Sequence, residues 1–238
     1  MKNIYSEIIA SKDKKLLAIL LDPDKLSVEK TVDLVSKINS SPATHIFVGG
    51  SSFEGNHLDE LITTIKQNTN LPVVLFPGNP SQISNQADGI LFLTLLSGRN
   101  PDYLIEHQIN AVPFLKKTNL EIISTGYILI ESGSETAVQR VTKTQPIDRN
   151  NIEYVIQTAQ AGELIGNKLI YLEAGSGAQL AVPLDMVRLV RQNTTVPLIV
   201  GGGIRSQKEI ENAFEAGANM VVIGTAFETN SNFFNTQL

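Results

Sequence analysis

Two glycine-rich turns late in the sequence each follow a short apolar run. Residues 201–203 are three glycines after the apolar residues 196–200, and Gly224 with Thr225 follows the apolar residues 218–223. Turns of this kind leave backbone N–H groups free to bind an anion, and each precedes a possible helix start. In a (β/α)8 barrel, the loops after strands seven and eight form a frequent phosphate site. The pair of turns therefore predicts a phosphate-bearing ligand at the carboxyl end of a barrel.

A glutamate at the end of another apolar run is the candidate general base. Alternation along this run puts Tyr171 and Glu173 on one face, and residues 175–177 (Gly-Ser-Gly) follow directly. A carboxylate at the end of a barrel strand can take a proton from a substrate, and the glycines and serine add N–H and hydroxyl donors. The alternative is a structural ion pair of Glu173 with Arg205 or Lys168, and the sequence favours neither interpretation.

Asp22 and Ser51 follow the first two apolar runs and offer oxygen atoms to a hard cation. Mg²⁺ takes few protein oxygens and shares the rest of its shell with phosphates, and adjacent strand ends lie about 5 Å apart. A magnesium site is therefore one hypothesis. The alternatives are a turn and helix N-cap at Asp22 beside Pro23, and an N-cap in an ordinary glycine turn at Ser51.

The bulk composition excludes several classes of protein. The chain has 238 residues, of which 42% are hydrophobic, so it can bury a large core. A net charge of −5 without a long basic run argues against nucleic acid as a partner. The absence of cysteine excludes disulfides and thiolate metal sites, and no apolar run is long enough for a transmembrane segment. The N-terminus lacks the apolar core of a signal peptide, so we expect a cytoplasmic protein.

Apolar runs alternate with helical patterns along the whole chain, which is typical of parallel βαβ units. Eight candidate strands and a length near that of one barrel predict an α/β fold, with residues 1–238 forming a single (β/α)8 TIM-barrel domain. The expected strands are residues 16–22, 44–49, 73–76, 89–95, 121–130, 168–173, 196–200 and 220–224, and the expected helices are residues 28–39, 58–67, 103–107, 152–165, 184–192 and 207–215.

Two segments depart from a regular barrel. Residues 78–87 are short and contain Gly78 and Pro80, so we expect no full helix there and a barrel modified around its third helix. Residues 132–151 are polar and predict a long loop, or a lid, over the barrel mouth.

Five segments taken together resemble the geranylgeranylglyceryl phosphate synthase family. The resemblance runs in order over nearly the whole chain, and its most specific part is the Tyr-Leu-Glu block; the glycine turns are shared by many barrels. The segments are residues 20–25 (LLDPDK), 48–51 (VGGS), 171–177 (YLEAGSG), 201–205 (GGGIR) and 224–225 (GT).

The resemblance implies an enzyme that joins sn-glycerol 1-phosphate to a polyprenyl diphosphate with the help of Mg²⁺, releasing diphosphate. It implies that Asp22 and Ser51 hold the metal and that Glu173 takes the proton from the attacking hydroxyl. It also implies an oligomer of identical chains, with transient membrane contact as one way to collect the donor. The residues implied to hold the glycerol phosphate are Tyr171, Leu172, Glu173, Ala174, Gly175, Ser176, Gly177, Gly202, Gly203, Gly224 and Thr225.

A prenyl tail needs an apolar groove, and candidate walls are Phe76, Phe92, Leu95 and Phe114, each of which also suits the core. Some bacterial members of the family carry Tyr-Leu-Glu-Tyr-Ser-Gly and a lysine where this chain has Leu20. The sequence therefore resembles the other branch, for which geranylgeranyl is the first choice of tail and a longer chain the second.

Two further hypotheses stay open from the residues. The glycine pair also suits another phosphate-binding barrel enzyme, such as a sugar-phosphate isomerase, which would work without a metal. A non-catalytic phosphate-binding barrel is the third hypothesis, and the carboxylates of Asp22 and Glu173 at strand ends argue against it.

Overall fold

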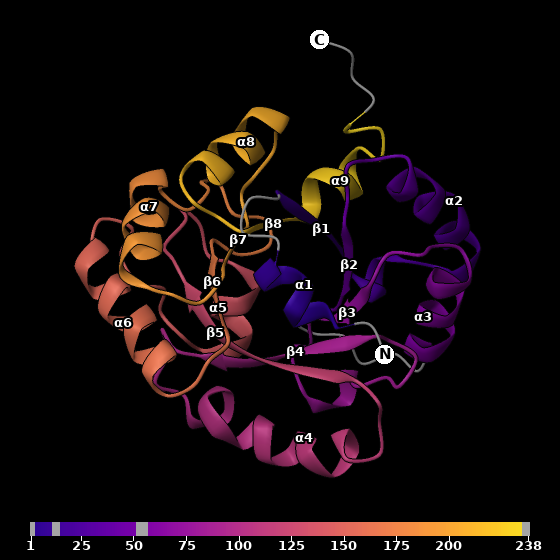
Figure 1. Ribbon diagram of the computed structural model, residues 1–238, viewed down its shortest axis with the longest axis horizontal. Helices are drawn as coiled ribbons and strands as arrows, with labels where there is room; N and C mark the ends of the chain where they lie inside the picture. Colours follow the sequence, from indigo (N-terminus) through magenta and orange to yellow (C-terminus); the bar gives the residue numbers. More distant parts are fainter. Residues whose placement is uncertain (1–2, 11–14, 51–56, 235–238) are drawn as a thin grey trace.

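Eight parallel strands close into a barrel in the order β1 to β8 (Figure 1). The computed structural model describes residues 3 to 10, 15 to 50 and 57 to 234. The barrel confirms the predicted fold class, and each expected strand is present within two residues of its predicted ends. The strands are β1 (Leu16–Leu21), β2 (His45–Val48), β3 (Val73–Leu75), β4 (Gly89–Leu95), β5 (Glu121–Leu129), β6 (Leu169–Glu173), β7 (Leu198–Gly201) and β8 (Met220–Ile223).

Helices surround the barrel, and their buried faces form one core layer with the outward side chains of the strands. Helix α8 shows how the sequence sets such a helix: Ser206 accepts a hydrogen bond from the Glu209 N–H, and the Glu209 carboxylate accepts one from the Arg205 N–H. This reciprocal capping starts the helix directly after the glycine turn. The helices are α1 (Ile4–Ala10), α2 (Val28–Asn39), α3 (Leu58–Gln67), α4 (His107–Leu115), α5 (Ala137–Thr142), α6 (Ile152–Leu164), α7 (Leu184–Asn193), α8 (Gln207–Glu215) and α9 (Thr225–Thr229), with short turns η1 (Pro23–Lys25), η2 (Pro80–Gln82) and η3 (Asp102–Glu106).

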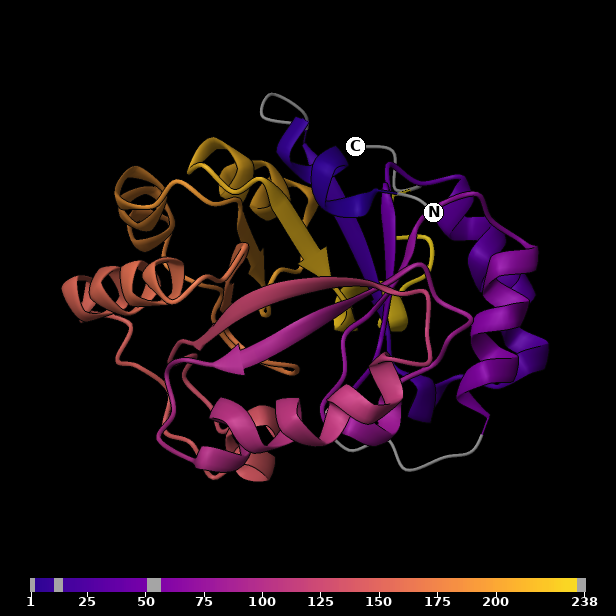
Figure 2. The same cartoon turned by 60° about the horizontal axis from the view of Figure 1, so that its bottom comes forward.

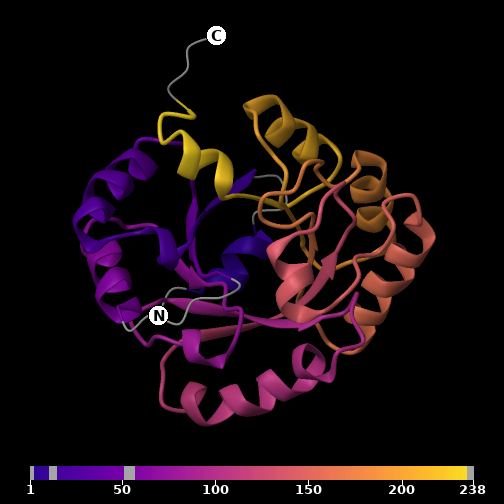
Figure 3. The same cartoon turned by 180° about the vertical axis from the view of Figure 1, so that it is seen from behind.

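Helix α1 covers the end of the barrel at which the strands begin. Ile4 and Ile8 are almost completely buried among the side chains that fill the barrel. Glu121, the first residue of β5, accepts hydrogen bonds from the N–H groups of Ile4 and Tyr5 at 2.6 and 3.0 Å. Figure 1 shows α1 over the near end of the barrel, and Figure 3 views the opposite end. The cavity must therefore open where the strands end.

The barrel wall loosens between β3 and β4. These strands pair only at Val74 with Gly89 and Leu75 with Ile90, whereas β4 and β5 pair over seven positions. Beyond Leu75 the chain forms only the short turn η2, which confirms the expectation that no full helix follows β3. Figure 2 shows the long β4 and β5 strands with α4 running along them. Because this helix is missing, space remains beside the C-terminal part of β4, which β3 does not pair with.

Two expectations about helices were wrong. The helix predicted at residues 103–107 is the π-helical turn η3 continued by α4, because Pro113 lies inside α4 and interrupts the sequence pattern without ending the helix. Residues 132–151 were expected to form a loop but contain α5. Thr136 caps the N-terminus of this helix, because its side chain accepts a hydrogen bond from the Gln139 N–H. Over the described ranges, no helix is both long and apolar enough to cross a membrane.

Candidate active site

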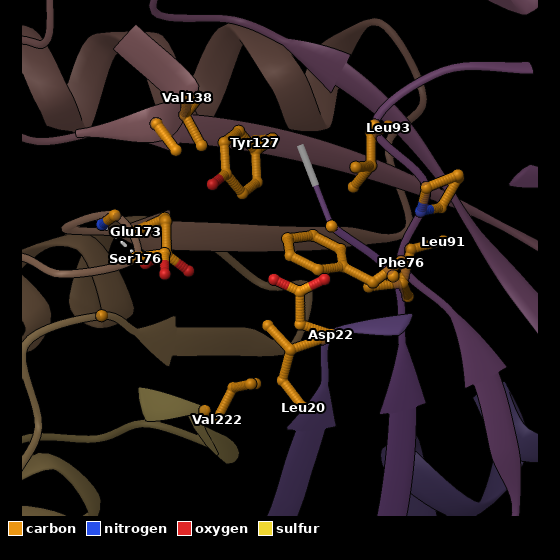
Figure 4. Close-up of a pocket in the computed structure, with 18 of the residues that line it drawn as sticks. Leu20, Asp22, Phe76, Leu91, Leu93, Tyr127, Val138, Glu173, Ser176 and Val222 are labelled. Carbon is orange, nitrogen blue, oxygen red and sulfur yellow. Dashed lines mark hydrogen bonds between the residues drawn. The ribbon is translucent and has the colours of Figure 1, made fainter. Parts of the chain in front are cut away.

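A cavity of about 540 Å³ opens at the carboxyl end of the barrel and extends into the space beside β4. Its polar part is lined by the ends of β1, β6, β7 and β8, and its apolar part by β4, α4, α5 and the segment after β3. Figure 4 shows the carboxylates of Asp22 and Glu173 and the hydroxyl of Tyr127 directed into this space, with Phe76, Leu91 and Leu93 along one wall.

Glu173 ends β6 in the middle of the polar part and is only 5% exposed. Its Oε1 accepts a hydrogen bond of 2.6 Å from the Gly175 N–H, which holds the carboxylate toward the glycine turns. Burial raises the pKa of Glu173 to about 7, although the Gly175 N–H and the Tyr171 hydroxyl favour the charged form. The carboxyl group is therefore poised to exchange a proton near neutral pH.

The aromatic rings of Phe76, Tyr127 and Tyr171 pack on one another and line the same cavity as Glu173. The rings of Phe76 and Tyr171 stack with centroids 5.5 Å apart, and Tyr127 meets Tyr171 edge to face at 5.3 Å. Burial and the Glu173 carboxylate raise the pKa of both tyrosines well above the usual value, so both stay protonated. The Tyr171 hydroxyl has no hydrogen bond of regular geometry in the described part of the chain, although it lies close enough to favour the ionised Glu173.

The glycine turns after β6 and β7 meet at Glu173. Gly175 and Gly202 adopt φ values of +101° and +79°, a region open to glycine but strained for other residues. A Cβ atom on Gly202 would lie 2.2 Å from Glu173 Oε1 and 2.6 Å from the Gly175 nitrogen. The close approach of backbone to backbone explains why only glycine fits at residue 202, and it joins two distant segments into one cradle of N–H groups.

The other residues expected to hold the glycerol phosphate divide into two groups. Leu172 and Ala174 are fully buried among the side chains of the helix-facing core, on the opposite face of β6 from Glu173. The residues that line the cavity are Tyr171, Gly175, Ser176, Gly177, Gly202, Gly203, Gly224 and Thr225, together with Glu173.

Asp22 follows β1 at the mouth of the cavity and has the N-cap role that the sequence also allowed. Its Oδ1 accepts a hydrogen bond of 3.1 Å from the Asp24 N–H, and its Oδ2 lies 3.4 Å from the Lys25 ammonium. Lys25 also contacts the Glu228 carboxylate at 2.9 Å. Burial opposes the charge on Lys25, but the two carboxylates outweigh it and raise its pKa. Ser51 lies outside the described residues.

The chain matches the model of the PcrB family over residues 9–237. It belongs to the PcrB family. A relative from Flavobacterium johnsoniae, a geranylgeranylglyceryl phosphate synthase, is 61% identical. The similarity covers 99% of this chain and 98% of that relative. A relative of the same name from Zunongwangia profunda is 50% identical over 96% of this chain and 98% of its own length. The resemblance to the geranylgeranylglyceryl phosphate synthase family is thereby confirmed.

Solved structures agree with this assignment. The crystal structure of (S)-3-O-geranylgeranylglyceryl phosphate synthase from Thermoplasma acidophilum in complex with sn-glycerol-1-phosphate is 32% identical, with a TM-score of 0.93. The similarity covers 99% of this chain and 95% of that chain. The α-subunit of tryptophan synthase from Pyrococcus furiosus is 13% identical with a TM-score of 0.57, which shows a shared fold alone.

In this PcrB-family chain, three of the four residues predicted to form the walls of a prenyl groove do line the cavity. Phe76, Phe92 and Leu95 line the cavity, whereas Phe114 lies on α4 outside the lining and is 56% exposed. Phe92 and Leu95 come from the part of β4 that β3 leaves unpaired.

Several residues of the site were missed by sequence reasoning. Tyr127 lies inside β5, where an apolar strand pattern conceals an inward hydroxyl. Lys25 was visible in the Asp-Pro-Asp-Lys turn, but its contact with Glu228 joins η1 to α9 where the neighbouring strands β1 and β8 end. Val138 lies on α5, within the segment that was expected to be a loop, and lines the cavity. The spacing of Val138 and Val141, three residues apart as on one face of a helix, was the available signal.

Proposed function

We propose that this protein joins sn-glycerol 1-phosphate to geranylgeranyl diphosphate. A hydroxyl oxygen of the glycerol phosphate bonds to the first carbon of the prenyl chain, the carbon–oxygen bond to diphosphate breaks, and the hydroxyl proton goes to Glu173. The observation that carries the proposal is one cavity, in a PcrB-family chain, that joins a buried carboxylate and glycine turns to an apolar groove. The similarity to a relative named geranylgeranylglyceryl phosphate synthase supports the same reaction.

The glycine turns are the proposed phosphate site. Gly202 and Gly203 adopt positive φ values, as do Gly175 and Gly177, so two N–H-bearing turns face one small volume. Such turns bind an anion through fixed dipoles, and the hydroxyl of the bound glycerol then lies within reach of Glu173. Ser176, which is exposed at the cavity, adds a hydroxyl donor.

Glu173 is the proposed general base. With a pKa of about 7, a large fraction of its carboxyl groups is ionised at neutral pH and still basic enough to accept a proton. The buried aromatic rings of Tyr127 and Tyr171 exclude water from one side of it. The substrate hydroxyl is thus held beside its base in surroundings that strengthen electrostatic interactions.

The groove beside β4 is the proposed site of the prenyl tail. Its walls include Leu91, Phe92 and Leu93 of β4, with Val138 of α5 near the mouth. Burial of apolar surface stabilises a bound hydrocarbon by about 25 cal/mol for each Å² removed from water. A geranylgeranyl chain is the first choice of donor, and a longer prenyl chain is the alternative.

Mg²⁺ is the proposed cofactor, with Asp22 and Ser51 as its protein ligands. The described residues contain no group of three or more His, Cys, Asp or Glu side chains that could hold a metal by themselves. The Asp22 carboxylate lines an open cavity, and this fits the mode in which Mg²⁺ binds one carboxylate and takes its other oxygens from water and substrate phosphate. When bound, the ion would neutralise negative charge on the leaving diphosphate.

The test is the mass of the product formed from sn-glycerol 1-phosphate and a series of prenyl diphosphates of increasing length. An ether-linked prenylglyceryl phosphate, formed by wild type and lost in Glu173→Ala with an unchanged circular dichroism spectrum, is the expected result. Turnover that persists in EDTA would refute the metal assignment. Undiminished product from the folded Glu173→Ala variant would refute the base assignment.

A further inference from the structure

The hydroxyl of Tyr127 is a buried polar group that opens into the cavity. The Tyr127 side chain is only 5% exposed and lines the cavity, and Figure 4 shows its hydroxyl directed into this space. Within the described ranges, this hydroxyl has no hydrogen bond to the protein. Buried polar groups almost always have a partner, so a hydroxyl that the protein leaves without one points to a partner in the ligand.

Tyr171, the neighbour of Tyr127 on β6, has its hydroxyl in different surroundings. The Tyr171 hydroxyl is completely enclosed by protein atoms, and a Cβ atom on Gly201 would lie 2.5 Å from it. A substrate atom therefore has no free approach to this oxygen. Of these two tyrosines, Tyr127 is the one whose hydroxyl a substrate can contact.

The strand register places Tyr127 between the apolar groove and the proposed base. Tyr127 pairs with Leu95 of β4 on one side and with Tyr171 of β6 on the other. Leu95 belongs to the wall of the groove, and Glu173 lies two residues beyond Tyr171 on the same face of β6. A prenyl carbon that enters from the groove and a hydroxyl held at Glu173 therefore meet beside Tyr127.

The Tyr127 hydroxyl acts as a hydrogen-bond donor in these surroundings. Burial, and then the charge of Glu173, raise the pKa of Tyr127 well above the usual value. The hydroxyl therefore keeps its proton at neutral pH, and the influence of the carboxylate shows that the two groups are close. An oxygen atom placed between them can accept a hydrogen bond from Tyr127 and donate one to Glu173.

We propose that the Tyr127 hydroxyl donates a hydrogen bond to the attacking oxygen of sn-glycerol 1-phosphate. The inference rests on the proposed function. The attacking oxygen is that of the terminal hydroxyl, which extends farthest from a phosphate held in the glycine turns. This oxygen has one proton and two lone pairs. Its proton points to Glu173 and one lone pair points to Tyr127, so the second lone pair is directed at the first prenyl carbon.

Tyr127 is in this way a catalytic residue that orients the nucleophile. The directed lone pair forms the new carbon–oxygen bond, while the bond from the same carbon to diphosphate breaks and its electron pair leaves with the diphosphate. The proton of the attacking hydroxyl goes to Glu173, and Tyr127 keeps its own. A hydroxyl with a single hydrogen bond still rotates about it, and the second hydrogen bond removes this rotation.

The test compares Tyr127→Phe, which removes the hydroxyl and keeps the ring, with a matched control. The control is Tyr5→Phe, at a tyrosine of α1 that packs against the same interior core from the opposite end of the barrel. Calorimetry without a prenyl donor gives the affinity for sn-glycerol 1-phosphate and for propane-1,2-diol 1-phosphate of the same configuration, which lacks the terminal hydroxyl. Steady-state kinetics give kcat and KM, and thermal unfolding checks the fold of each variant.

We expect Tyr127→Phe to bind sn-glycerol 1-phosphate roughly threefold to tenfold more weakly than wild type, as for the loss of one neutral hydrogen bond. Its affinity for the analogue should equal that of wild type, because the analogue has no oxygen for Tyr127 to contact. Its kcat should fall by about a factor of ten or more, because the attacking lone pair is no longer directed. Tyr5→Phe should match wild type in every measurement.

Four results would overturn the proposal. They are an equal loss of affinity for both phosphates, a wild-type kcat in Tyr127→Phe, the same losses in Tyr5→Phe, and wild-type kinetics in Tyr127→Phe together with their loss in Tyr127→Leu, which would assign the role to the ring. A loss of affinity confined to sn-glycerol 1-phosphate, with no turnover of any prenyl donor by wild type, would instead refute the proposed function and leave the contact with the terminal hydroxyl in place.

Discussion

Replacing Glu173 with glutamine should both abolish activity and stabilise the protein at high pH. Glutamine keeps the shape of the side chain and can still accept the hydrogen bond from the Gly175 N–H. It cannot accept the substrate proton, so kcat should fall by roughly two to four powers of ten. It also carries no charge, and this removes the cost of ionising a carboxyl group that is 5% exposed.

The magnitude follows from the raised pKa. The pKa of Glu173 is about 7 in the folded protein against an ordinary value of 4.5. Between these values the unfolded chain has already lost the proton while the folded protein keeps it, so the free energy of unfolding falls as the pH rises. The loss is complete above the folded pKa and amounts to about 3 kcal/mol. The glutamine variant escapes this loss, which in a chain of this size corresponds to roughly 6–12 °C in Tm.

The assay is urea unfolding of wild type and Glu173→Gln across the range from about pH 4 to about pH 8. The difference in the free energy of unfolding should grow in favour of the variant as the pH rises and level off above neutrality. Glu153→Gln, at an exposed carboxylate of α6, is the control and should show no such trend. A difference that stays constant with pH, or a variant that keeps wild-type turnover, would refute the reasoning about burial and proton transfer.

The remaining predictions concern the pH profile, the glycine cradle, the metal ligand and the groove. In wild type, kcat/KM should rise with pH and level off above about 7, because Glu173 acts in its ionised form; a flat profile would contradict this. Gly202→Ala should raise the KM for sn-glycerol 1-phosphate about tenfold or more and lower the unfolding free energy, because its Cβ would collide with Glu173. Gly166→Ala, at φ +102° with nothing within 4 Å, should lower stability alone. Asp22→Asn should increase the Mg²⁺ concentration needed for half-maximal activity, measured by titration; an unchanged titration would exclude Asp22 as a ligand. Leu93→Trp should raise the KM for geranylgeranyl diphosphate more than that for a donor of half the length, and equal effects would place the tail elsewhere.

The helices and strands that the sequence predicted well are those with one clear period. The α2, α3 and α8 helices match their predicted bounds because each has one apolar face and a polar remainder. The helix predicted at residues 103–107 was too short, because Pro113 interrupts the helical pattern of the residues that follow. In the structure α4 continues through Pro113, with Gln108 and Leu115 packed in the interior. Local pattern cannot show that tertiary contacts outweigh an unfavourable proline.

The candidate site was also predicted in part. Glu173 and Asp22 lie at one mouth because parallel strands all end on the same side of a barrel, a rule that needs no coordinates. Tyr127 and Lys25 were missed because their roles depend on partners from distant elements, Tyr171 of β6 and Glu228 of α9.

The sequence by itself determined the barrel, the polarity of its ends and the glycines that bring two turns together, since these depend on periodicity and on backbone conformations open only to glycine. Tertiary structure decided the acidity of Glu173 and the shape of the groove. The pKa of a carboxyl group depends on the water excluded around it by Tyr127, Tyr171 and other distant residues. The missing helix after β3, which the sequence predicted, leaves room for the groove, but the shape of the groove also depends on the separation of β3 from β4 after two paired positions, which no local run of residues specifies.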